Sequence, residues 1–203
     1  MTTWALIPVK SFEQAKSRLS SALSAAERAR FAEDLFVHVL EAAMSARLID
    51  RVAVVSNSEP VLAAAEARGA LGLPDHPRGT GLANVVDSAL RELEARGAAR
   101  VIICMSDLPR VSPSELDAVV GALEHVDLVL SPDAAATGTN VIGMAASGLL
   151  PSCLGHDDSL VRHRARAREL GLQFRILKSP GLALDVDTPE DLERLHDWPR
   201  GNE

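Results

Sequence analysis

The chain has 203 residues, of which 47% are hydrophobic and 24% charged, and its net charge is −7. This composition is typical of a globular protein, and the length suits one domain with a sizeable core. The negative charge disfavours a surface that follows the phosphates of DNA or RNA, and an aromatic content of 3% disfavours stacking of exposed bases. No apolar run reaches the ~18 residues that a membrane span needs, so we expect a cytoplasmic protein.

The first predicted strand leads directly into a cationic loop. Residues 4–8 form an apolar run that ends at Pro8, which has no N–H to donate to a sheet ladder. The loop after it carries three cations, Lys10, Lys16 and Arg18. In open α/β sheets the end of the first strand commonly faces a phosphate-bearing ligand, which favours a phosphate site over a solvated surface loop.

Strands and helices alternate along the rest of the chain. Helical spacing, N-caps such as Ser24 and Thr188, and terminal glycines predict helices over residues 25–44, 59–68, 84–96, 114–123, 159–170 and 189–196. Short apolar runs predict strands over residues 51–56, 70–73, 100–105, 127–131, 139–144, 173–178 and 182–186. Turn-forming residues predict irregular segments over 74–81, 132–138 and 145–158.

This alternation predicts one three-layer α/β domain over residues 1–203, with a mostly parallel sheet and helices on both faces. Helix is denser before about residue 125, and short strands are denser after it. We therefore expect a nucleotide-binding half over residues 1–125 and an acceptor and metal half over residues 126–203.

Three carboxylates stand at the ends of predicted strands. Asp107 follows the most apolar strand, while Asp185 and Asp187 are two residues apart in a segment predicted to be extended, so their side chains would share one side. Neighbouring carboxylates repel unless a cation lies between them, and oxygen ligands suit Mg²⁺. The pattern predicts a magnesium site at these three residues, with helix capping as the alternative role of Asp187.

Polar turns supply further candidates. Thr139 follows a predicted loop, and Gly155 and Ser159 precede a helix, where N–H and hydroxyl groups can bind an anion, although each is also compatible with an ordinary turn. The sequence has no P-loop, no complete Rossmann glycine pattern and no Ser/His/Asp arrangement, which disfavours nicotinamide cofactors and triad chemistry. Cys104 and Cys153 form neither a metal pattern nor a disulfide framework.

Taken together, these motifs resemble those of the phospholactate and phosphoenolpyruvate guanylyltransferases of coenzyme F-420 biosynthesis. That family is similar to the wider nucleotidyltransferases of the molybdenum-cofactor guanylyltransferase type. The resemblance covers nearly the whole chain, in the order and approximate spacing of the family. The shared motifs are Pro8-Val9-Lys10, Lys16-Ser17-Arg18-Leu19, Ser56-Asn57-Ser58, Gly81-Leu82, Ser106-Asp107-Leu108-Pro109, Gly138-Thr139-Asn140 and Asp185-Val186-Asp187-Thr188.

The resemblance implies a fold like that of the nucleotide-diphospho-sugar transferases and a Mg²⁺-dependent reaction of GTP with 2-phospholactate, phosphoenolpyruvate or 3-phosphoglycerate. By resemblance, the catalytic residues are Lys10, Lys16, Arg18 and Asp107, and the Mg²⁺ ligands are Asp107, Asp185 and Asp187. The implied nucleotide contacts are Pro8, Val9, Ser56, Asn57, Gly81, Leu82 and Asn84. The implied acceptor contacts are Thr139, Gly155 and Ser159.

Two segments depart from the family pattern. The loop from Gly155 to Ser159 is one residue longer than the usual form, and Ala83 stands where many relatives have asparagine, with Asn84 next to it. The family also makes a deazaflavin transferase the natural downstream partner, and it is compatible with a homodimer.

We expect the acceptor's phosphate oxygen to attack the α-phosphorus of GTP and expel pyrophosphate, with catalysis by positioning and charge neutralisation. One alternative is a nucleotidyltransferase with another acceptor, such as a molybdopterin or a sugar phosphate. Those enzymes usually have a glycine-rich first loop, whereas residues 4–19 contain no glycine here. The other alternative is a non-catalytic GTP-binding subunit, which would bind GTP without releasing pyrophosphate.

Overall fold

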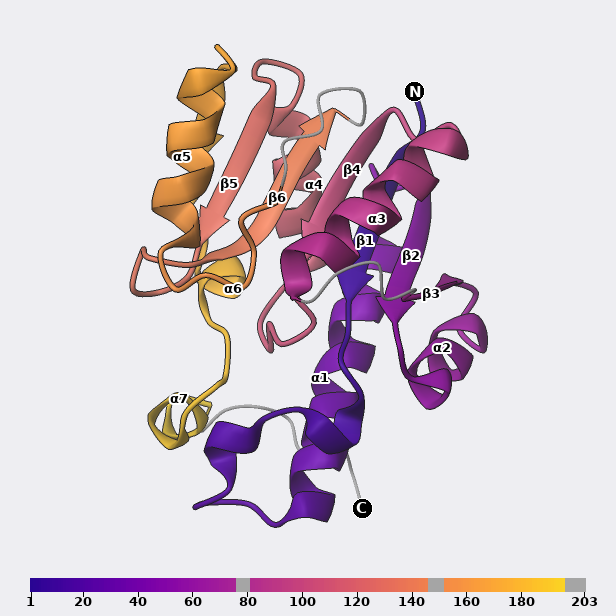
Figure 1. The fold of residues 1–203 in the computed structure, drawn as a ribbon, viewed down its shortest axis with the longest axis vertical. Coiled ribbons are helices and arrows are strands. Elements are labelled where there is room, and N and C mark those ends of the chain that lie inside the picture. Colours follow the sequence, from indigo (N-terminus) through magenta and orange to yellow (C-terminus); the bar gives the residue numbers. More distant parts are fainter. Residues whose placement is uncertain (76–80, 146–151, 196–203) are drawn as a thin grey trace.

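One sheet of seven strands organises the computed structural model, which describes residues 1–75, 81–145 and 152–195 (Figure 1). The strands, in sheet order, are β3 (Leu71–Pro74), β2 (Arg51–Ser56), β1 (Thr3–Pro8), β4 (Arg100–Cys104), β6 (Thr139–Ala145), β5 (Leu128–Pro132) and β7 (Phe174–Ile176). β6 runs antiparallel to β4 and β5, and the other neighbouring pairs are parallel. The predicted mostly parallel sheet is confirmed.

Helices cover both faces of the sheet. One apolar cluster joins it to α1 (Ala25–Ser45), α2 (Glu59–Glu66), α4 (Pro113–Ala122) and α6 (Pro180–Ala183). A second cluster joins the opposite face to α3 (Leu82–Ala95) and α5 (Ser159–Glu169). This is the three-layer arrangement that the alternation of elements predicts. No helix within the described ranges is both long and apolar enough to cross a membrane.

The predicted helix starts at Ser24 and Thr188 are confirmed as capping boxes. Ser24 accepts the N–H of Glu27 at the start of α1, and Thr188 accepts the N–H of Asp191 at the start of α7 (Pro189–Glu193). In each box the acidic side chain accepts a hydrogen bond from the N–H of the cap residue, so two otherwise free N–H donors at the helix start are satisfied.

The predicted strand over residues 182–186 is wrong. Residues 180–183 form the short helix α6, and the chain from Leu184 to Asp187 has no regular structure. Pro180 suits the first helical turn, and Gly181 packs so closely against Glu115 and the carbonyl of Arg110 that no side chain fits there. The strand from which we placed Asp185 and Asp187 on one side is therefore absent.

The other predicted elements match to within a few residues. The strand predicted over 173–178 is shorter, and the helix predicted from residue 84 begins at Leu82. Parts of the irregular segments predicted over 74–81 and 145–158, and the last residue of the helix predicted over 189–196, lie outside the described residues.

The start of β6 contains a β-bulge. Ser131 pairs with Val141 and Pro132 with Thr139, so Asn140 is an extra residue in β6. Thr139 reaches His163 of α5, while the Asn140 amide reaches the backbone of α6 on the opposite face, as successive side chains of a strand do. Because β6 is antiparallel to β4, both residues lie at the edge of the sheet where β4 ends.

Candidate active site

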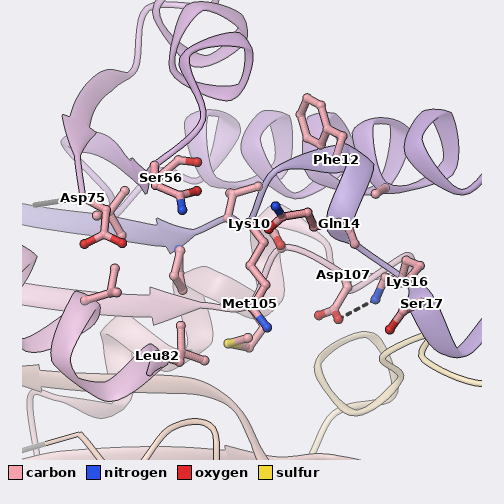
Figure 2. A pocket seen from close by; sticks show the side chains of 18 of the residues that line it. Lys10, Phe12, Gln14, Lys16, Ser17, Ser56, Asp75, Leu82, Met105 and Asp107 are labelled. Carbon is pink, nitrogen blue, oxygen red and sulfur yellow. Dashed lines mark hydrogen bonds and ion pairs between the residues drawn. The ribbon is translucent and has the colours of Figure 1, made fainter. Parts of the chain in front are cut away.

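A pocket of about 660 Å³ opens at the carboxyl ends of β1, β2 and β4 (Figure 2). Ser56 and Asp75 lie with Leu82 toward one end, and Lys16, Ser17 and Asp107 lie toward the other. The 3₁₀ turns η1 (Phe12–Gln14) and η2 (Ser17–Leu19) form the wall between β1 and α1. The ion pair of Lys16 and Asp107 lies at one end of the pocket, and the carboxylate of Asp75 lies at the other.

Lys16 is the centre of the charged end. Its Nζ lies 2.7 Å from Asp107 Oδ2 and 3.0 Å from Asp187 Oδ1, and its side chain is only 7% exposed. Burial lowers the pKa of Lys16, but the charges and hydrogen bonds of the two carboxylates outweigh burial and raise it above the usual value. Lys16 therefore carries a permanent positive charge that joins the first loop to β4 and to the segment before α7.

The backbone of Lys16 is left-handed, with φ 56° and ψ 35°. This conformation is uncommon for residues other than glycine and costs of order 1–3 kcal/mol unless the surroundings enforce it. The two ion pairs of the side chain are contacts that hold it in place.

Lys10 and Arg18 are more exposed cations. Arg18 Nη1 lies 3.6 Å from Asp187 Oδ2, with its side chain 68% exposed. Lys10 extends along the pocket between its two ends, and within the described part of the chain no carboxylate forms an ion pair with it (Figure 2). Both side chains can turn toward phosphates without first breaking a buried contact.

Asp185 lies close to the same charged group but not in the pocket wall. Burial, followed by the charge of Asp107 and more weakly that of Asp187, raises its pKa to about 6, although a hydrogen bond from Asn140 opposes the shift. The Asn140 amide donates to Asp185 Oδ1 at 3.3 Å and to the carbonyls of Leu182 and Ala183 at 3.1 and 3.2 Å. Asn140 thus fixes the irregular segment that carries Asp185.

The three carboxylates fit a divalent cation in charge and in donor type. The negative charges of Asp107 and Asp187 both act on Asp185, and a cation between the three would relieve this repulsion. They do not form a ready-made cage: in the described ranges, no three acidic, histidine or cysteine side chains lie close enough to hold a metal ion. Mg²⁺ typically uses one or two carboxylates together with substrate phosphates, so this arrangement is compatible with the ion. Magnesium binding stays a prediction.

Two of the three predicted acceptor residues, Thr139 and Ser159, belong to a separate, buried network. The Thr139 hydroxyl lies 3.1 Å from His163 Nδ1 and 3.4 Å from Ser159 Oγ, and all three residues are buried. On the other side of the imidazole, the Cys153 N–H donates to His163 Nε2 at 2.9 Å. The network connects β6, α5 and the loop before α5.

The loop before α5 touches the nucleotide side of the molecule. The Ser152 N–H donates to Asp87 of α3 at 2.9 Å. Gly155 has φ 88°, and a Cβ at this position would lie 3.4 Å from the Cβ of Leu82, which lines the pocket. The predicted acceptor loop and the pocket are therefore neighbours.

Burial lowers the pKa of His163 from 6.5 to about 4, and a hydrogen bond to the Ser159 backbone opposes the shift. As the pH falls, His163 becomes protonated near pH 6.5 in the unfolded chain but only near pH 4 in the folded chain. The free energy of unfolding therefore decreases as the pH falls from about 6.5 to about 4. We expect His163 to contribute about 3 kcal/mol to the loss. Urea unfolding of the wild type and of His163→Leu at pH 7 and pH 4.5 measures this contribution, because the wild type should lose more unfolding free energy between the two pH values than the variant does. An equal loss in both proteins would contradict the prediction.

The structure brings together most of the predicted nucleotide and catalytic residues. Those that line the pocket are Pro8, Val9, Lys10, Lys16, Arg18, Ser56, Asn57, Gly81, Leu82, Asp107 and Asp187. Those that lie outside its lining are Asn84, Thr139, Gly155, Ser159 and Asp185. Their binding roles stay predictions.

The sequence analysis missed four residues. Asp75 lines the pocket at the end of β3, and Asn140, Glu115 and His163 hold segments of the site through side-chain hydrogen bonds. Asp75 had a usable signal, since it directly follows a strand. The other three act through partners far along the chain, which no local pattern reveals.

Comparison with known proteins places the chain among guanylyltransferases. Residues 3–198 match the family model described as "Guanylyl transferase CofC like". A phosphoenolpyruvate guanylyltransferase of Sphaerobacter thermophilus is 41% identical over 96% of this chain and 93% of its own. A 2-phospho-L-lactate guanylyltransferase of Methanothermobacter thermautotrophicus is 35% identical over 96% and 84%, and a 3-phospho-D-glycerate guanylyltransferase of Phenylobacterium zucineum is 32% identical over 97% and 91%.

Solved structures agree with the fold. A crystal structure of a candidate nucleotide-diphospho-sugar transferase from Desulfovibrio desulfuricans G20 has a TM-score of 0.82 to this chain, at 19% sequence identity. The match covers 100% of this chain and 90% of the other. At this identity the likeness concerns the fold alone, and it confirms the predicted fold type.

Proposed function

We propose that this chain, which belongs to the family of CofC-like guanylyl transferases, transfers GMP from GTP to a small phosphorylated carboxylic acid and releases pyrophosphate. The observation that carries the proposal is the pocket, whose lining brings the cations Lys10, Lys16 and Arg18 together with the carboxylates Asp107 and Asp187. By resemblance to its relatives, the product feeds coenzyme F-420 biosynthesis, with a deazaflavin transferase as the natural next enzyme. We place the enzyme in the cytoplasm, where GTP is made.

The two ends of the pocket suit the two ends of GTP. Asp75 and Ser56 lie at the end away from Lys16, where a carboxylate can accept the N1–H and N2–H hydrogens of guanine. Lys10, Lys16 and Arg18 suit the triphosphate, because charge-assisted bonds to phosphate oxygens are stronger than neutral ones. Asn57 and Gly81 also line the pocket.

The chain's chemical task in this reaction is positioning and neutralisation of charge. The acceptor's phosphate oxygen attacks the α-phosphorus while the bond to the pyrophosphate oxygen breaks, and an ionised phosphate needs no general base. Lys10, Lys16 and Arg18 stabilise the negative charge that develops on the leaving pyrophosphate. Asp107, Asp185 and Asp187 would hold Mg²⁺, which supplies Lewis-acid neutralisation of phosphate oxygens.

Pyrophosphate release from GTP tests the reaction. We expect release with at least one of phosphoenolpyruvate, 2-phospholactate and 3-phosphoglycerate, none without an acid, and loss of release when EDTA removes Mg²⁺. ATP in place of GTP controls for base selection. Release that persists in EDTA would refute the magnesium proposal, and GTP binding without release for any acid would favour a non-catalytic GTP-binding subunit.

A further inference from the structure

The imidazole of His163 has one hydrogen-bond pattern that its neighbours permit. Its Nε2 lies 2.9 Å from the backbone N–H of Cys153, which can only donate, so Nε2 must be the unprotonated acceptor. In the neutral ring the hydrogen is then on Nδ1, which faces the Thr139 hydroxyl at 3.1 Å.

This tautomer decides the direction of the Thr139 hydroxyl. Because Nδ1 carries a hydrogen, Thr139 Oγ1 can only accept from the ring, and the Ser159 hydroxyl also donates to Thr139 Oγ1 at 3.4 Å. Within the described part of the chain both contacts use Thr139 as an acceptor, so the hydrogen of its own hydroxyl is directed elsewhere. A carboxylate or phosphate can only accept, and a hydroxyl whose hydrogen is uncommitted is the donor that such a ligand needs.

We infer that His163 is a positioning residue for the acceptor acid: its Nδ1–H orients the Thr139 hydroxyl as a donor, and its Nε2 fixes the loop from Ser152 to Asp158 at Cys153. The inference rests on the proposed function, in which Thr139, Gly155 and Ser159 contact the acid. His163 itself is buried and does not line the GTP pocket, so we expect its effect on the acid to exceed its effect on GTP.

Steady-state kinetics with each substrate varied in turn tests this role. For His163→Leu we expect the KM for the acid to rise about tenfold or more, the size of effect seen when a residue that hydrogen-bonds to a ligand-binding side chain is removed. The KM for GTP should change less than twofold. His163→Asn, whose amide can donate to Thr139, is expected to recover most of the affinity for the acid. Thr139→Val should raise the same KM, and the double variant should be no worse than Thr139→Val alone.

Ala167→Gly is the matched control, because Ala167 is buried one turn further along α5 and has no part in the network. It should loosen the helix by about 1 kcal/mol without changing the KM for the acid. An unchanged KM for the acid in folded His163→Leu, or an equal rise in Ala167→Gly, would overturn the inference.

Nitrogen NMR of the wild-type ring gives a readout that needs no catalysis. We expect the Nδ1–H tautomer of His163 at pH 7, and the Nε2–H tautomer would overturn the inference even if the variants behave as expected. If the wild type releases no pyrophosphate with any acid, the proposed function fails. The NMR measurement of the His163 tautomer still tests the hydrogen-bond network in that case.

Discussion

Asp107→Ala is expected to lower the rate of pyrophosphate release by about 10³-fold or more, which corresponds to about 4 kcal/mol of lost transition-state stabilisation. Asp107 lies three residues after the end of β4, lines the pocket, bonds to Lys16 and acts electrostatically on Asp185. Its loss would remove a proposed metal ligand and one of the two carboxylates that hold Lys16 in the pocket.

The fold should survive this change. The Asp107 side chain is 19% exposed, Lys16 keeps Asp187 as a partner, and the adjacent Leu108 holds the turn in the core. Asp107→Asn, which keeps the shape and removes the charge, is the isosteric partner variant and should be nearly as slow. Asp117→Ala, at a carboxylate that bonds the backbone of Arg47 and Leu48 away from the pocket, should keep the wild-type rate. A wild-type rate for Asp107→Ala with an intact melting transition would refute the assignment.

Lys16→Met is expected to lower the turnover by about 10²- to 10³-fold, because the phosphates lose a buried cation. Unlike the other cations, Lys16 should also affect stability. Without its ammonium, Asp107 loses its ion-pair partner and Asp187 keeps only the exposed Arg18, so we expect the free energy of unfolding to fall by about 1–3 kcal/mol, reduced from the fully buried case because Asp187 is 43% exposed.

Lys10→Met is the matched control for stability. Lys10 is exposed and forms no ion pair with a described carboxylate, so its loss should slow the reaction while leaving the unfolding free energy within about 0.5 kcal/mol. Urea unfolding in EDTA and in excess Mg²⁺ separates the two effects. Added Mg²⁺ should restore part of the stability of Lys16→Met, and equal stability of the two variants would contradict the role of Lys16 as the countercharge.

The fold was largely predictable because its signals are local. Buried β-branched runs such as residues 51–56 and 100–104, and capping boxes at Ser24 and Thr188, involve residues within a few positions of one another. The segment over 182–186 misled the prediction because four of its five residues are apolar, as in a buried strand. Contacts of Gly181 with Glu115, 66 residues away, decide its actual conformation.

The site was predictable in residue type but not in arrangement. The sequence motifs include Lys16, Asp107 and Asp187. The ion pairs of Lys16, however, are with residues 91 and 171 positions away in the chain. The Asn140 bulge and the tautomer of His163 depend on strand register and on a backbone N–H, which side-chain patterns do not encode. These are the features for which the structure was required.

The reversal of strand direction between β4 and β6 has a consequence for how such enzymes diversify. The residues proposed for the nucleotide belong to β1–β4 and their loops, whereas Thr139, Ser159 and His163 lie on the other side of that boundary. Residues that share no contacts act nearly independently under substitution, and Thr139, Ser159 and His163 do not line the pocket; the loop before α5, which bonds α3, is where the two groups meet. A change of acceptor can therefore accumulate on one flank of the sheet while selection preserves the nucleotide flank, and the relatives named for three different acids are compatible with this division.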